Sequence, residues 1–375
     1  MDKDRSGQMM TESQTFLLAL VRMALWGCHE PLPENRPDWN QVFALSKQQT
    51  LIGLVAEAVP MLPSHLQPDH SIRIKLHTTA MRILQSHILV NRKVAEIKTK
   101  MDSCGIHTVL LKGQGVALNY PNPQSRQCGD IDLYVGESNF GKVYQMLEPA
   151  PLKKYMHLKH FSINGGGVEI EVHRIAADLP GIRRNRRFQD WTISNLSGQS
   201  VRKVEIADTS INLPPAEFDA LYIMNHAWNH FMTGGIGLRQ LVDWAMHLHR
   251  FHKDIDIENL RNYLQDFGLM NAWHILSGIA VKHLGLPAAE CPLYEAGSTA
   301  KSDDVLEVIW DEGNFGHHSA LRKTPRPQGY LAGKLYSFKA NTSRITRILL
   351  ISPKDVISTW VFYFINGIRH IIHKS

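Results

Sequence analysis

Two aspartates stand two residues apart in a short apolar segment, Gly129-Asp130-Ile131-Asp132-Leu133-Tyr134-Val135. In a strand, alternate side chains point to the same face, so Asp130 and Asp132 share one face while Ile131 and Leu133 face the other. Two like charges on one face are unfavourable unless a cation lies between them. Mg²⁺ is the cation expected there, with Mn²⁺ as the alternative, because it prefers carboxylate and phosphate oxygens. A single Asp-x-Asp pair also occurs on solvated strands, so its meaning depends on the flanking segments.

A glycine turn precedes this strand. The apolar run Leu110-Leu111 leads into Lys112-Gly113-Gln114-Gly115, and the residues after it predict the start of a helix. Glycine lets a backbone approach a phosphate closely, and the amides at a helix start favour an anion. Lys112, beside the turn, and Arg126, in the loop before the Asp-x-Asp strand, are the basic side chains expected to meet phosphate.

A second acidic strand follows a run of glycines at 165–167. Its alternation places Glu169, Glu171 and His173 on one face and apolar residues on the other. A third carboxylate completes the ligand set that two-metal phosphoryl transfer requires. From the spacing alone, either glutamate can supply it.

The order of glycine turn, Asp-x-Asp strand and acidic strand resembles the nucleotidyltransferase superfamily whose best-known member is DNA polymerase beta. The closer resemblance is to the bacterial family of uncharacterised nucleotidyltransferases. It rests on Leu111-Lys112-Gly113, on the run from Arg126 to Val135 and on Glu171-Val172-His173, and it extends to 234–240 and Asp243. It therefore covers roughly residues 100 to 250. One position departs from the pattern, because Gln114 stands where the superfamily usually has Gly or Ser.

The resemblance implies an α+β fold, with a small mixed-sheet nucleotidyltransferase core between N-terminal and C-terminal helical regions. It implies transfer of a nucleoside monophosphate from an NTP, expected to be ATP, to a hydroxyl group with release of pyrophosphate. Asp130, Asp132 and Glu171 would be the catalytic and metal-binding residues, since the Glu-x-His match favours Glu171 over Glu169. Residues 112–114 and Arg126 would bind the nucleotide. The acceptor would be an unidentified small molecule or protein, because no RNA-recognition motif with interleaved aromatic residues is visible.

Two further functions stay open from the sequence. One is a non-catalytic, regulatory nucleotide-binding protein, although such a protein would be expected to have lost one of the three carboxylates. The other is a membrane-surface-associated assembly protein. It rests on residues 356–375, where apolar side chains alternate with basic ones in a pattern that suits either a membrane surface or a docked terminal helix.

Helical periodicity predicts an N-terminal helical region over residues 1–100 and a C-terminal helical domain over 211–375. The core, residues 101–210, contains predicted strands at Thr108–Leu111, Ile131–Val135, Phe161–Ile163 and Val168–His173, and a helix at Phe140–Leu147. With 43% hydrophobic and 20% charged residues, the chain has the composition of a folded protein. Its net charge of +6 suits an anionic partner without choosing among them. Four dispersed cysteines and a polar N-terminus favour the cytoplasm.

Three other patterns invite interpretation. The basic residues of Arg183–Arg187 indicate either a solvated loop or a segment that binds phosphate groups. His226 and His230 have helical i, i+4 spacing that can hold zinc, but no third ligand is evident, so core or acceptor-site histidines are the preferred interpretation. Asp254-Ile255-Asp256 repeats the Asp-x-Asp letters without strand flanks and is expected to cap the following helix.

Overall fold

The computed structural model describes residues 10–147, 159–198, 200–314 and 344–372, with only the backbone described from residue 363 onward. Its centre is a four-stranded sheet with the order β1-β2-β4-β3. The strands are β1 (Val109–Leu111), β2 (Ile131–Tyr134), β3 (His160–Asn164) and β4 (Glu169–His173). β2 runs antiparallel to β1 and parallel to β4, so the sheet is mixed. All four predicted strands are confirmed, with bounds that differ by one residue or so.

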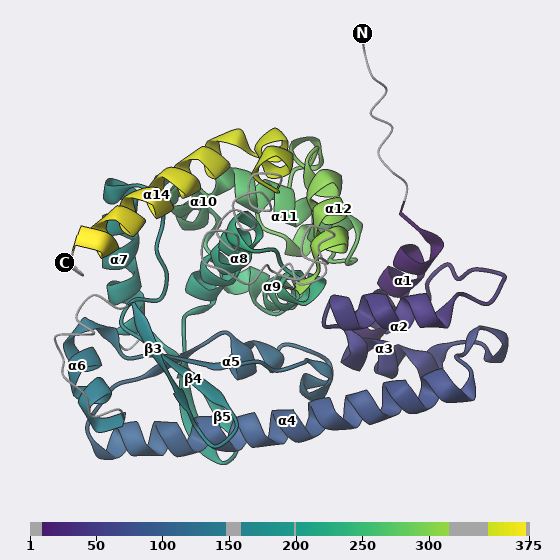
Figure 1. Cartoon of the computed structure of the whole chain (residues 1–375), viewed down its shortest axis with the longest axis horizontal. Helices are drawn as coiled ribbons and strands as arrows, with labels where there is room; N and C mark the ends of the chain where they lie inside the picture. Colours follow the sequence, from purple (N-terminus) through teal and green to yellow (C-terminus); the bar gives the residue numbers. More distant parts are fainter. Residues whose placement is uncertain (1–9, 148–158, 199, 315–343, 373–375) are drawn as a thin grey trace, which may run out of the picture.

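A single long helix underlies the sheet (Figure 1). Helix α4 (His70–Ser103) is 34 residues long. Asp69 caps its N-terminus, where the Asp69 carboxylate accepts the Ile72 amide at 2.9 Å. Its C-terminal half carries Val90 and Val94, which pack with α6 (Gly136–Leu147) against the apolar side of the sheet. This small core leaves the opposite, acidic face of β2 and β4 to be covered by other helices.

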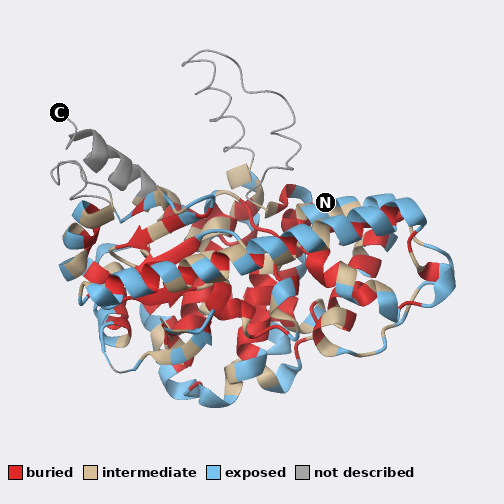
Figure 2. Cartoon of the chain, turned by 90° about the horizontal axis from the view of Figure 1, so that it is seen from below, coloured by how far each residue is buried: buried red, intermediate tan, exposed pale blue. Residues whose placement is uncertain are grey.

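Six helices form a layer on the side of that acidic face, and the first two of them contribute residues to the cavity above it. They are α8 (Ala216–Thr233), α9 (Leu238–Phe251), α10 (Ile257–Phe267), α11 (Met270–Lys282), α12 (Ser302–Glu312) and α14 (Pro353–Ile372). The N-terminal helices α1 (Glu12–Trp26), α2 (Trp39–Gln48) and α3 (Ile52–Ala58) share one large hydrophobic core with them. Figure 2 shows buried residues both in the sheet and in the helices around it. The α+β class is confirmed, whereas the division at residues 100 and 210 stays a prediction.

The structure corrects some sequence interpretations and confirms another. A hairpin, β5 (Arg202–Ile206) with β6 (Thr209–Leu213), was not predicted. The basic residues of Arg183–Arg187 lie on helix α7 (Ile182–Leu196) rather than in a loop. The capping role of the second Asp-x-Asp sequence is confirmed, because Asp256 accepts the Asn259 amide at 2.8 Å at the start of α10.

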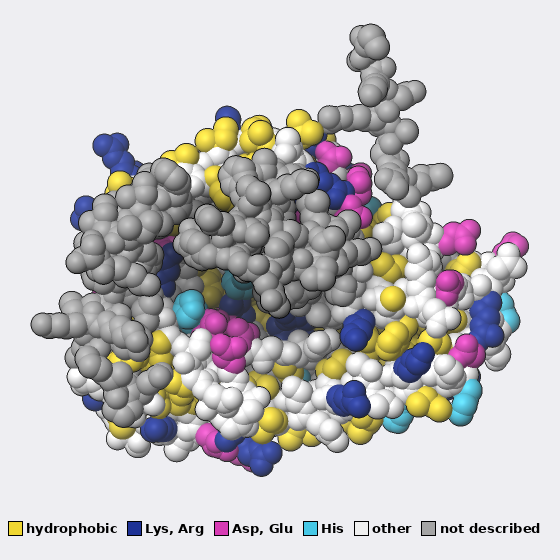
Figure 3. All heavy atoms as spheres, viewed as in Figure 1, with side chains coloured by type: hydrophobic (Ala, Val, Ile, Leu, Met, Phe, Trp, Pro, Cys, Tyr) yellow, Lys and Arg dark blue, Asp and Glu magenta, His cyan; other side chains and the backbone are white. Residues whose placement is uncertain are grey.

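In the described part of the chain, no helix combines the length and apolarity needed to span a bilayer. Figure 3 shows one face of the molecule. On the part of it that the described residues form, basic side chains are scattered among acidic and apolar ones.

Candidate active site

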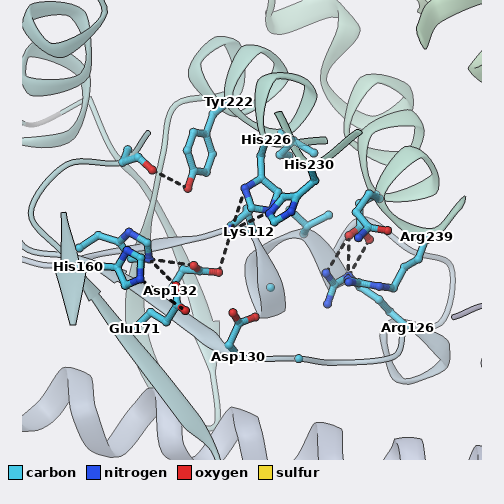
Figure 4. Close-up of a pocket in the computed structure, with 18 residues that line it drawn as sticks. Lys112, Arg126, Asp130, Asp132, His160, Glu171, Tyr222, His226, His230 and Arg239 are labelled. Atoms are coloured by element: carbon cyan, nitrogen blue, oxygen red, sulfur yellow. Dashed lines mark hydrogen bonds and ion pairs between the residues drawn. The ribbon is translucent and has the colours of Figure 1, made fainter. Parts of the chain in front are cut away.

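A cavity of about 410 Å³ lies between the acidic face of β2 and β4 and the helices α8 and α9 (Figure 4). Its lining is rich in charged and aromatic side chains. The lining residues are Lys112, Gly113, Val116, Arg126, Gly129, Asp130, Asp132, His160, Glu171, His173, Ala176, Tyr222, Ile223, His226, His230, Arg239, Gln240 and Asp243.

The pairing of β2 with β4 brings the acidic residues together. Asp132 lies opposite Glu171 in the parallel register, and Asp130 precedes β2 by one residue. All three line the cavity. Glu169 is exposed, lies opposite Asn164 at the outer end of β4, and does not line this cavity. The geometry therefore favours Glu171 over Glu169 as the partner of the two aspartates.

Asp132 is enclosed by cationic groups. Its Oδ2 lies 3.2 Å from Lys112 Nζ, and His173 Nε2 contacts its Oδ1 at 3.0 Å. Burial on its own would raise the pKa of this carboxyl, but Lys112 and His173 outweigh burial and hold the pKa well below its usual range. His173 also lies 3.4 Å from Glu171 Oε2. Against the effect of burial, its contacts with the two carboxylates raise the pKa of His173 to about 8.

The donor set fits a divalent metal ion. Ligand atoms of Asp132, Glu171 and His173 all lie within 4.8 Å of one another. Asp130 adds a third carboxylate, and desolvation together with the charge of Asp132 raises the pKa of Asp130. Carboxylates crowded in this way favour an added cation, and oxygen donors are the ligands that Mg²⁺ prefers.

The glycine turn positions Lys112 by means of an unusual backbone. Lys112 has φ +51°, in the region that favours glycine, and Gly113 follows with φ +48°. Such strain persists only where the surroundings enforce it, and it is often found at functional sites. The turn directs Lys112 Nζ to Asp132 and to the ring of His226, 3.3 Å away.

The side chain of Gln114, a residue expected to bind nucleotide, points away from the cavity. Its side chain does not line the cavity but is buried, and its amide donates to Asn91 Oδ1 on α4. The larger residue at the position of the usual Gly or Ser is thus accommodated on the far side of α5 (Gly113–Ala117). Any contact of Gln114 with a nucleotide would have to come from its backbone.

Helix α8 adds three rings at i, i+4 and i+8, which are Tyr222, His226 and His230. Desolvation, followed by the charge of Lys112, lowers the pKa of His226 and brings that of His230 to about 4, so both rings stay neutral at pH 7. Among the described residues, the one group with metal-binding geometry does not include them. The zinc interpretation therefore receives no support.

The opposite end of the cavity holds two arginines around one carboxylate. Arg126 makes a two-point ion pair with Asp243, at 2.7 Å and 2.8 Å. Arg239, one turn earlier on α9, lies 3.3 Å from the same carboxylate. Arg126 thus reaches the cavity as expected. Arg187 does not, because it lies on α7 and pairs with Asp266 at 2.9 Å.

Among the lining residues with polar side chains, sequence reasoning did not place His160 and Tyr222 at the site. His160 enters because β3 pairs with β4, which places it opposite His173. Tyr222 enters from α8 and donates to the Ala176 carbonyl at 3.3 Å. No local sequence pattern predicts that either residue lines the cavity. The register of β3 against β4 determines the position of His160, and the packing of the buried helix α8 determines that of Tyr222.

The model of a family described as uncharacterised nucleotidyltransferase matches residues 35–285. No curated protein sequence matches the chain. Among solved structures, an antigenic nucleotidyltransferase-like protein from Paracoccidioides brasiliensis is similar, with 14% sequence identity and a TM-score of 0.33. The similarity covers 56% of this chain and 95% of that one.

Proposed function

Because this chain belongs to the uncharacterised nucleotidyltransferase family, we propose that it transfers a nucleoside monophosphate from an NTP to a hydroxyl group, in a reaction that depends on Mg²⁺. ATP is the expected donor, and the acceptor is a small molecule or a protein side chain. The observation that carries the proposal is the convergence of Asp130, Asp132 and Glu171 on one cavity. Metal-dependent nucleotidyl transfer requires carboxylates that hold the metal, and three of them line this one cavity.

Five of the lining side chains have roles that follow from their contacts. Asp130, Asp132 and Glu171 would hold the metal, and a bound divalent ion would neutralise the triphosphate and make the acceptor hydroxyl more acidic. The contact with His173 lowers the pKa of Glu171, so this carboxylate is ionised at neutral pH. Lys112 would contact phosphate oxygens from its position beside Asp132. Positioning and charge neutralisation supply most of the catalysis in reactions of this class.

A direct test is incubation of the full chain with each α-³²P-labelled NTP, Mg²⁺ and a cell extract, followed by separation of small molecules from protein. Label that becomes attached to a discrete acceptor supports the proposal, and the Asp130→Asn variant should abolish it. If no NTP gives labelled product while calorimetry shows that nucleotide binds, the regulatory alternative replaces the transferase. The presence of all three carboxylates favours the enzyme over that alternative.

A further inference from the structure

Arg126, Asp243 and Arg239 form a cluster whose charges do not balance. Arg126 is 4% exposed and Asp243 6% exposed, so their ion pair is sealed within the protein. Arg239 shares the same carboxylate, and the Tyr120 hydroxyl donates to it at 2.6 Å. Two guanidinium groups therefore share one carboxylate, which leaves a net positive charge within this cluster.

Two N–H groups of this cluster also lack acceptors. Within the described residues, Arg126 Nη1 and Arg239 Nε are buried and have no hydrogen-bond partner. A buried, unsatisfied donor on a charged group is costly, and structures rarely keep one without a reason. Here two such donors belong to neighbouring guanidinium groups, and both side chains line the cavity. An anion with several oxygens would satisfy both donors and the remaining charge.

The cluster lies to one side of the three carboxylates. In Figure 4, Asp130 stands between the Asp132–Glu171 pair and the labelled arginines. The electrostatic contacts agree with this arrangement. Arg239 interacts with Asp130, whereas Asp132 interacts with Lys112 and His173, and Glu171 with His173 and His160. An NTP whose α-phosphate reacts at the carboxylates would have its remaining phosphates free to extend past Asp130 to the arginines.

We propose that Arg126 and Arg239 together bind the terminal phosphate of the NTP, and that Asp243 holds both guanidinium groups in place for it. The inference rests on the proposed function, and it specifies which part of the substrate binds at this end of the cavity. Guanidinium groups suit the task because each presents several N–H donors in a plane that matches phosphate oxygens. The site would then distinguish a triphosphate from a diphosphate.

The test is calorimetric titration of the full chain, in Mg²⁺, with an ATP analogue whose α–β bridge is a methylene group, and separately with ADP. Arg239→Gln is the informative variant, because among the described residues the Arg239 side chain makes one ion pair, at 3.3 Å, whereas Arg126 belongs to the buried two-point ion pair with Asp243. We expect Arg239→Gln to weaken binding of the ATP analogue at least tenfold and to change ADP binding less than twofold. Arg187→Gln, an exposed arginine outside the cavity, is the matched control and should change neither.

Other outcomes overturn the assignment. If Arg239→Gln weakens the binding of the ATP analogue and of ADP equally, Arg239 does not bind the terminal phosphate. If Arg239→Gln changes the binding of neither nucleotide, the cluster does not bind the NTP. Its ligand would then be a different anion, such as a phosphate group on the acceptor. Thermal melting of each variant shows whether a loss of binding comes from unfolding. Failure of the proposed function looks different, since the unmodified chain would then bind neither nucleotide or would bind without transferring label.

Discussion

Asp132 and Glu171 face each other across the parallel pairing of β2 with β4, and His173 contacts both carboxylates. This arrangement joins two acidic residues that are 39 positions apart in the sequence and presents them to one cavity together with Asp130. The two aspartates nevertheless have different surroundings, because Asp132 is 3% exposed and Asp130 lies open to solvent. Substitutions at the two positions should therefore differ in their effect on stability.

Asp130→Asn should abolish nucleotidyl transfer and leave the melting temperature nearly unchanged, because the side chain that it alters is exposed. Asp132→Asn should abolish transfer and also destabilise the fold by about 1–3 kcal/mol, since it leaves buried cationic groups without their counter-charge. Label transfer and thermal melting, measured on the same preparations, check both expectations. Full activity in a folded Asp130→Asn variant would remove this residue from the site.

Glu171→Gln should reduce turnover by orders of magnitude, whereas Glu169→Gln should reduce it ~10-fold or less, equivalent to about 1.4 kcal/mol of barrier. The reason is position, because Glu171 lies opposite Asp132 and Glu169 is exposed at the outer end of the strand. The two variants are natural controls for each other, since they make the same change on one strand. The opposite ranking would move the third carboxylate outward by two residues.

NTP binding should depend on divalent metal. The triphosphate and the three carboxylates repel one another at close range, and Lys112 and the arginine cluster offset only part of this repulsion. We expect a non-hydrolysable NTP to bind at least tenfold more weakly in EDTA than in Mg²⁺, a difference of about 1.4 kcal/mol. Calorimetric titration in the two buffers measures it. Equal affinities would place the nucleotide away from the Asp-x-Asp strand.

Local patterns were sufficient to predict the carboxylates but not their surroundings. Strand alternation put Asp130, Asp132 and Glu171 on shared faces, and this information lies within a few neighbouring residues. The contact between Arg126 and Asp243 joins residues 117 positions apart, so only the packing of α9 beside the loop before β2 creates it. The hairpin β5–β6 escaped prediction because its turn residues, Ala207 and Asp208, have φ +48° and +58° without a glycine to mark them.

The outer face of α14 offers a test of membrane-surface association. Ile357 and Val361, one turn apart, are 58% and 53% exposed, while Val356 beside them is buried. If this face meets lipid, the full chain should sediment with vesicles that contain anionic lipid, and the double variant Ile357→Ser, Val361→Ser should remain in solution. The variant should keep its melting temperature, because both side chains are exposed. Equal sedimentation of the two proteins, or of neither, would leave α14 as a docked terminal helix.

Acid should destabilise the protein partly through His247, which is fully buried and does not line the cavity. Its Nε2–H donates to the Ala216 carbonyl at 2.8 Å, and desolvation lowers the pKa of His247 to about 3. The unfolded chain has the ordinary histidine pKa of about 6.5, so it binds more protons than the folded chain below that pH. The stabilising contribution is thus complete above pH 6.5 and is lost as the pH falls towards 3. Its slope reaches about 1.4 kcal/mol per pH unit.

Urea unfolding at pH 7.5, 6.5, 5.5 and 4.5 measures this dependence. His247→Gln keeps an N–H donor for Ala216 but cannot titrate, so its free energy of unfolding should fall less steeply with acid than that of the unmodified chain. His226 and His230 shift in the same direction, so part of the slope should remain in the variant. The exposed His65→Gln serves as the control and should keep the full slope. Parallel curves for the unmodified chain and His247→Gln would show that this ring does not set the acid limit of the fold.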